Sequence, residues 1–86
     1  MYQPAYSKRF EKQIRKFPKK EQLKILQKIV SCLSNPKQYS IKLATTKPSV
    51  YRLRAGEYRV FFELDNLTKT MIITDVERRT TQTYRH

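Results

Sequence analysis

Three arginines near the middle of the chain are spaced so that they could bind phosphate together. Arg52 and Arg54 precede Gly56, the only glycine of the sequence, and Arg59 follows it. A guanidinium group is planar and donates paired hydrogen bonds that match phosphate oxygens, whereas a lysine offers a hydrated point charge. Arginines brought together from two neighbouring segments therefore predict a phosphate-binding surface.

A β-hairpin would place these arginines on one surface. Residues 50–55 and 58–64 alternate between apolar and polar side chains, as strands with one buried face do. Gly56-Glu57 between them supplies a two-residue turn, in which a glycine tolerates the positive φ that is needed. Because side chains alternate between the two faces of a sheet, apolar and polar residues separate. We expect Tyr51, Leu53, Tyr58, Val60, Phe62 and Leu64 on the buried face, and Arg52, Arg54, Arg59, Phe61 and Glu63 on the other.

This register sets two arginines directly against each other. Arg54 faces Arg59, and Arg52 faces Phe61. Like charges opposed across two strands repel each other when no anion is bound, so the arrangement costs stability. The alternative is an ordinary solvated sheet face, with water between the arginines. The charge of the whole chain and the use of arginine rather than lysine favour phosphate binding.

The chain is strongly basic. It has 19 lysines and arginines against seven acidic residues, a formal net charge of +12. So high a charge in 86 residues implies an anionic partner: nucleic acid, an acidic protein or an anionic membrane. Most lysines lie in residues 1–42 and most arginines in residues 43–86. We expect the lysines to give a diffuse attractive field and the arginines to make the specific contacts.

Length and composition limit the class of protein. The chain has room for one domain, residues 1–86, with one modest core. It has no apolar stretch of about 18 residues that could span a membrane, and its start lacks the order of a secretory signal, so we expect a cytoplasmic protein. Cys32 is the only cysteine and His86 the only histidine, and the acidic residues form no spaced cluster. We therefore expect no metal, no disulfide and no small-molecule cofactor, with Cys32 as a buried apolar residue.

The first part of the chain predicts a short strand and a helix. Residues 2–6 form the strand, and Pro4 places it at an edge because proline cannot donate to a central ladder. Ser7 follows as the N-cap of the helix. The helix stops at Pro18 and carries the apolar stripe Phe10, Ile14 and Phe17.

A second helix is predicted over residues 19–33, where Asn35-Pro36 ends it. Its wet side carries Lys20, Lys24 and Lys28. Its predicted buried side carries Leu23, Leu26, Ile29, Val30 and Leu33. The two helices would form a hairpin.

The remaining segments complete a sheet. Residues 39–48 predict an irregular connection with room for a short strand at 41–43, residues 65–68 a second turn, and residues 69–76 a last strand. The predicted fold class is α+β, a helical hairpin packed on one face of a small twisted antiparallel sheet, in the order β-α-α-β-β-β.

The polar tail, residues 77–86, adds more basic and aromatic groups. Arg78 and Arg79 follow the last strand, and Tyr84-Arg85-His86 end the chain. If the tail folds back beside the sheet, it brings charge and a ring to the arginines. Aromatic stacking with arginines on phosphates is typical of single-stranded RNA recognition. The alternative for Tyr84 is packing against the sheet edge.

The hairpin resembles a known motif. Residues 51–62 are similar to the Y-R-L-R-x-G-[DE]-Y-R-V-x-[YF] hairpin of the RelE/ParE toxin superfamily, and the helical hairpin and basic tail extend the resemblance over nearly the whole chain. The resemblance implies a RelE-like fold and the toxin of a type II toxin–antitoxin system. RelE-like toxins cleave messenger RNA in the ribosomal A site, and a neighbouring antitoxin neutralises them.

The resemblance also implies which residues act. Basic residues on the hairpin, an arginine after the last strand and a tyrosine near the C-terminus form the active site of RelE-like toxins. Carried over to this chain, the catalytic residues are Arg52, Arg54, Arg59, Arg78 and Tyr84, with Arg79 a close rival of Arg78. We expect further RNA contacts from Arg79, Arg85, Phe61 and Lys42.

One departure from the family bears on the chemistry. RelE has lysines at the positions of Arg52 and Arg54, and a guanidinium cannot accept a proton near neutral pH. The implied reaction is attack of a ribose 2′-hydroxyl on the adjacent phosphate, so another group must be the base. Tyr84, in a positive field, ranks ahead of His86 and Glu63. Glu63 is expected rather to pair with a neighbouring arginine.

Three functions stay open at this point. The first is a ribosome-dependent endoribonuclease, the second a ParE-like inhibitor of DNA gyrase, and the third an inactive relative that binds RNA or an antitoxin. The expected partners are messenger RNA on the ribosome and an acidic antitoxin segment laid over the basic face, with no membrane.

Overall fold

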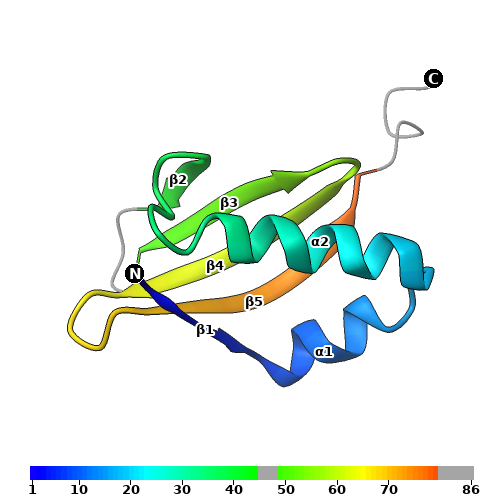
Figure 1. Cartoon of the computed structure of the whole chain (residues 1–86), viewed down its shortest axis with the longest axis horizontal. Helices are drawn as coiled ribbons and strands as arrows, with labels where there is room; N and C mark the ends of the chain where they lie inside the picture. The colour runs from blue at the N-terminus through cyan, green and yellow to red at the C-terminus, as the bar shows by residue number, and fades with distance from the viewer. Residues whose placement is uncertain (45–48, 80–86) are drawn as a thin grey trace.

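The computed structural model describes residues 1–44 and 49–79. Two helices cover one face of a five-stranded sheet, whose strand order is β1-β5-β4-β3-β2 (Figure 1). This confirms the α+β class and the helical hairpin. The elements are β1 (Gln3–Tyr6), α1 (Lys8–Ile14), α2 (Lys19–Ser31), β2 (Ser40–Ala44), β3 (Val50–Ala55), β4 (Tyr58–Asp65) and β5 (Thr70–Arg78).

The sheet departs from the predicted order in two ways. The short segment at 41–43 is a full strand, β2, so the order is β-α-α-β-β-β-β. The first strand, β1, pairs with β5 in parallel, whereas all other neighbours are antiparallel. As Pro4 required, β1 lies at one edge of the sheet, and β2 lies at the other.

The central hairpin has the predicted register. Arg54 pairs with Arg59, and Arg52 with Phe61. Gly56 has a φ of +62°, the left-handed conformation that a side chain would strain in this turn. Buried and half-buried residues alternate along β4 without interruption, so its two faces are cleanly separated.

The core lies between this sheet and the helices. Its side chains come from α1, α2, the three strands β3, β4 and β5, and the segment that follows α2, where Cys32 is buried as predicted. Neither helix is long and apolar enough to cross a membrane. The least exposed members are Phe10, Ile25, Ile29, Cys32, Leu53, Val60, Phe62, Met71 and Ile73.

The predicted buried side of α2 is partly wrong. Leu23 and Val30 are 60% and 58% exposed, while Ile25, which the prediction left out, is fully buried with Ile29. The helix carries two apolar stripes, and only the one that includes Ile25 and Ile29 faces the sheet. Leu26 lies between the stripes and is partly buried.

Candidate nucleic-acid interface

The sheet face opposite the helices carries the hairpin arginines. We call it the arginine face, and Arg52, Arg54, Arg59, Phe61 and Glu63 share it by register. Their alternating neighbours Leu53, Val60 and Phe62 are fully buried beneath the helices. Arg54 is exposed, and Arg52 and Arg59 are half-buried. Three guanidinium groups from two adjacent strands therefore reach the same solvent-facing surface.

Carboxylates offset only part of this charge. Glu77 stands opposite Arg59 across the β4–β5 ladder, and the two side chains form an ion pair of 3.9 Å. Within residues 1–44 and 49–79, no carboxylate lies within ion-pair distance of Arg52 or Arg54. Both groups can therefore bind an anion without first breaking an ion pair in the described structure.

Arg78 and Arg79, the two candidate arginines at the end of β5, lie on different sides of the sheet. Arg78 stands in register with the buried Tyr58, on the helical side of the sheet, and pairs with Glu57 at 3.3 Å. The backbone N–H of Arg79 donates to the carbonyl of Glu57 at 2.7 Å. Arg79 also lines a hollow of about 370 Å³ with Arg54, Gly56 and Glu57. The geometry thus brings Arg79, rather than Arg78, beside Arg54.

A second hollow on the arginine face was not foreseen from the sequence. We call it the Phe61 hollow, and it measures about 510 Å³. It lies where the β4–β5 ladder shifts register between Phe61 and Phe62, which turns both Thr74 and Asp75 away from the core. Its lining residues are Ser7, Arg9, Val50, Phe61, Glu63, Thr74 and Asp75.

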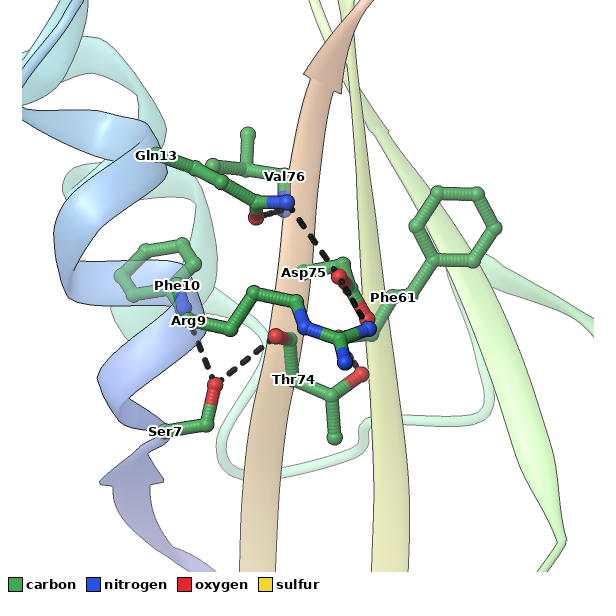
Figure 2. Close-up of polar contacts among 8 residues, drawn as sticks. All are labelled: Ser7, Arg9, Phe10, Gln13, Phe61, Thr74, Asp75 and Val76. Carbon is green, nitrogen blue, oxygen red and sulfur yellow. Dashed lines mark hydrogen bonds and ion pairs between the residues drawn. The ribbon is translucent and has the colours of Figure 1, made fainter.

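The start of α1 is fastened to this register shift (Figure 2). The Ser7 hydroxyl caps α1 by accepting from the N–H of Phe10 at 3.0 Å, and it donates to the Thr74 carbonyl at 2.7 Å. The Gln13 carboxamide accepts from the N–H of Val76 at 2.8 Å and donates to the Asp75 carboxylate at 3.3 Å. These bonds satisfy the strand edge that β1 no longer covers.

Arg9 reaches across β5 as a result. Its guanidinium lies 3.5 Å from the Asp75 carboxylate and remains 74% exposed. In Figure 2 the side chain extends from α1 past Thr74 toward Phe61. A helix residue thus adds one more arginine to a surface built from strands. The sequence pattern gave no signal for it, because the register shift in β5 is not visible in the alternation of residues.

The other predicted site residues differ in their placement. Lys42 is exposed but stands in register with Tyr51, so it lies on the helical side and not on the arginine face. The salt bridge expected for Glu63 is not found in the described part of the chain. Tyr84, Arg85 and His86 lie outside the described residues. In residues 1–44 and 49–79, no three His, Cys, Asp or Glu side chains gather as metal ligands would.

Among residues 1–44 and 49–79, one shifted pKa near this surface belongs to Asp65, at the end of β4. Backbone N–H groups of Thr68 and Leu67 donate to the Asp65 carboxylate, and the bond from Thr68 contributes most to holding its pKa below the ordinary value. Among the described residues, only Tyr6 shifts the other way, because burial raises the pKa of its hydroxyl.

A small basic domain with this fold and this surface can be compared with known proteins. Residues 5–82 match the family model described as the ParE toxin of type II toxin–antitoxin systems, parDE. The chain belongs to this ParE/RelE toxin family and is the toxin of such a system. A comparison with curated protein sequences finds no match.

Solved structures agree with the family. The RelE–RelB complex of Pyrococcus horikoshii matches with a TM-score of 0.80 and 25% identity, over 93% of this chain and 97% of that chain. The toxin–antitoxin complex RelBE2 of Mycobacterium tuberculosis matches with a TM-score of 0.82 and 18% identity, over 91% and 98%. The intact RelBE complex of E. coli matches with a TM-score of 0.74 and 21% identity, over 93% and 99%. The last two likenesses concern the fold alone.

Proposed function

We propose that this toxin is an endoribonuclease that cleaves messenger RNA on the ribosome. The observation that carries the proposal is the arginine face, where Arg52, Arg54 and Arg59 come together from two adjacent strands. Guanidinium groups fixed around one phosphodiester stabilise the extra negative charge of the transition state. A toxin with this activity would work in the cytoplasm.

The reaction we propose is attack of a ribose 2′-hydroxyl on the adjacent phosphate. It forms a bond between phosphorus and the 2′-oxygen and breaks the bond between phosphorus and the 5′-oxygen of the next nucleotide. The products are a 2′,3′-cyclic phosphate and a 5′-hydroxyl, which gains one proton while the 2′-hydroxyl loses one. Arg52, Arg54 and Arg59 hold the phosphate oxygens, and Arg79 joins them from the end of β5. Arg78, by contrast, is engaged by Glu57.

A proton acceptor is needed as well, because arginines stay protonated near neutral pH. Tyr84 and His86 of the tail are candidates by sequence, and Glu63 is the candidate on the arginine face itself. The carboxylate of Glu63 is half-buried in the Phe61 hollow. Replacement of each in turn, with cleavage measured against pH, distinguishes them: loss of the base lowers the rate and removes the limb of the pH–rate profile on which the rate rises with pH.

The cognate antitoxin is the second proposed partner. The similar chains from Pyrococcus horikoshii and Mycobacterium tuberculosis were solved in complexes with their antitoxins. In this chain, the outer stripe of α2 exposes Leu23 and Val30 beside Leu26, around a hollow of about 330 Å³. Exposed lysines flank the stripe, so an acidic amphipathic segment fits it in both polarity and charge.

The test of the enzymatic proposal is induction of the toxin in growing cells with mapping of new 5′ ends. We expect cuts within translated messages and few in untranslated RNA. Arg59→Ala should abolish the cuts, and Arg15→Ala, an exposed arginine on the helical side, should not. A DNA-damage response without message cleavage would instead favour inhibition of DNA gyrase, the alternative that a ParE-type family leaves open.

A further inference from the structure

The Phe61 hollow combines an aromatic ring with two carboxylates, and of these residues only Glu63, as a candidate base, enters the proposed cleavage. It sits beside the arginines, yet two of its side chains are acidic, in a chain with only seven acidic residues. Acidic groups beside a phosphate-binding surface repel RNA unless they contact something other than phosphate. We propose that the Phe61 hollow binds one unpaired base of the RNA and prefers guanine. This inference rests on the proposed RNA-cleaving function and deepens it.

The position of Phe61 suits a base next to a bound phosphate. Phe61 stands opposite Arg52 across the β3–β4 ladder and two residues from Arg59 on the same face. Neighbouring strands lie about 4.8 Å apart, and alternate residues of a strand about 6.6 Å apart. A nucleotide whose phosphate contacts Arg52 or Arg59 therefore has its base within reach of the Phe61 ring.

The floor and wall of the hollow suit the face of a base. The Phe61 ring is half-buried and accessible from the arginine face, and Val50 adds an apolar wall. An unpaired base gains binding free energy by stacking on an aromatic ring, and this gain depends little on which base it is. The volume of about 510 Å³ is ample for a single purine. Stacking supplies affinity, so discrimination must come from the edge of the base.

The carboxylates supply that discrimination. Asp75 stands opposite Phe61 on β5, and Glu63 follows two residues along β4, so they flank the ring. A carboxylate only accepts hydrogen bonds. Guanine presents two adjacent donors, N1–H and the N2 amino group, whereas adenine and cytosine present one amino group each, and the N3–H of uracil lies between two carbonyls. The donor pattern therefore selects guanine.

The two carboxylates differ in how they are held. One oxygen of Asp75 accepts from Gln13 at 3.3 Å and faces Arg9 at 3.5 Å, which fixes the group and leaves its second oxygen for a ligand. In the described part of the chain, Glu63 has no ion pair that would occupy it. The exposed Arg9 guanidinium also offsets the repulsion between these acids and the RNA backbone.

The test measures binding by the isolated protein, without cleavage or ribosomes. Fluorescently labelled RNA heptamers carry 2′-O-methyl groups at every position, so the 2′-hydroxyl cannot attack. They contain uridines with one central guanine, adenine, cytosine or uracil. Anisotropy at low salt should show the guanine heptamer binding about fivefold or more tightly than the others, the scale of one bidentate contact.

Variants assign the preference to the hollow. Glu63→Gln and Asp75→Asn should each reduce the guanine preference to less than about twofold, without weakening the all-uridine heptamer. Phe61→Ala should weaken all four heptamers. Glu21→Gln removes the same charge from α2, where Glu21 pairs with Lys24, and should leave the preference intact. If Asp75→Asn proves less stable because Arg9 and Gln13 lose a partner, Glu63→Gln alone decides.

Each result has a meaning. No binding, equal binding of all four heptamers, or a guanine preference that survives both carboxamide variants would overturn the inference. If messages are cleaved in cells but the heptamers show no guanine preference, the proposal of a guanine-binding hollow is contradicted and the proposed nuclease function stands. If the heptamers show a guanine preference but no message is cleaved, the proposed nuclease function is contradicted and the guanine-binding hollow stands.

Discussion

Arg54 and Arg59 stand directly opposite each other on the arginine face, and of these two only Arg59 has a carboxylate partner, Glu77 at 3.9 Å, in the described structure. A protein selected for stability alone would place opposite charges across this ladder. On the proposed function, an anion binds between the two strands and relieves this repulsion, while Glu77 restrains the guanidinium of Arg59.

We expect Arg54→Ala to weaken phosphate binding and message cleavage without lowering the stability of the fold. Cross-strand repulsion disappears, so the free energy of unfolding should stay equal or rise by up to about 1 kcal/mol. Inorganic phosphate should raise the Tm of the parent protein more than that of the variant, because a ligand stabilises only the state that binds it. Thermal melts with and without phosphate check this. A variant that loses stability, or that still cleaves messages at the parent rate, would contradict the role given to the pair.

The two arginines at the end of β5 should differ in importance. Arg79→Ala should lower message cleavage about 100-fold, the scale of one lost transition-state donor, because Arg79 shares a hollow with Arg54. Arg78→Ala removes a side chain on the helical side that pairs with Glu57, and should cost far less. Single-turnover cleavage on programmed ribosomes measures both. The reverse order would show that Arg78 leaves Glu57 when RNA binds.

Substitutions in the two apolar stripes of α2 should affect different properties: antitoxin binding for the exposed stripe of Leu23 and Val30, and stability for the buried stripe of Ile25 and Ile29. Val30→Glu should leave the Tm within a few degrees and abolish binding of the antitoxin, because Val30 is 58% exposed. Ile29→Ala should lower the free energy of unfolding by about 2–5 kcal/mol, since it opens a cavity under a fully buried side chain. Urea unfolding and pull-down of the co-expressed antitoxin separate the two effects. An antitoxin that still binds Val30→Glu must dock elsewhere.

Much of this surface could be predicted from the sequence because its rules are local. A two-residue turn with a glycine fixes the register of the hairpin, and the register fixes which side chains share a face. The turn predicted at Gly56 therefore gave the correct placement of Arg52, Arg54 and Arg59. Another local rule, that proline cannot donate to a central ladder, correctly placed Pro4 at a sheet edge.

The parts that could not be predicted depend on contacts between distant segments. The rotation of α2 about its axis depends on its packing against the sheet. Periodicity alone could not decide whether the stripe of Ile25 or that of Leu23 is buried. The Phe61 hollow depends on an irregular register in β5, which brings Arg9 of α1 to Asp75, 66 residues away. A pattern within one segment does not report such a contact.

Asp65 should make stability depend on pH in the acidic range. Its pKa in the folded protein is lowered, chiefly by the N–H of Thr68, so folding favours the ionised form. Its contribution is therefore complete above the unfolded pKa of about 4 and is lost as the pH falls through the lower folded value. Asp65→Ala should be less stable than the parent at neutral pH and converge with it in strong acid. Unfolding curves at several pH values test this, and a constant difference between the two proteins would contradict it.

Gln13 should matter beyond its own helix, because it completes the hydrogen bonding of β5. Its carboxamide accepts from the N–H of Val76 at 2.8 Å, and Val76 is 2% exposed. Gln13→Ala leaves that buried donor without a partner, which should cost about 1–3 kcal/mol of the free energy of unfolding. Gln27→Ala, at an exposed position of α2, should cost almost nothing. Hydrogen exchange read at the Val76 amide distinguishes the mechanism: faster exchange there means that the strand edge has opened, whereas unchanged protection would show that β5 holds its irregular register without α1.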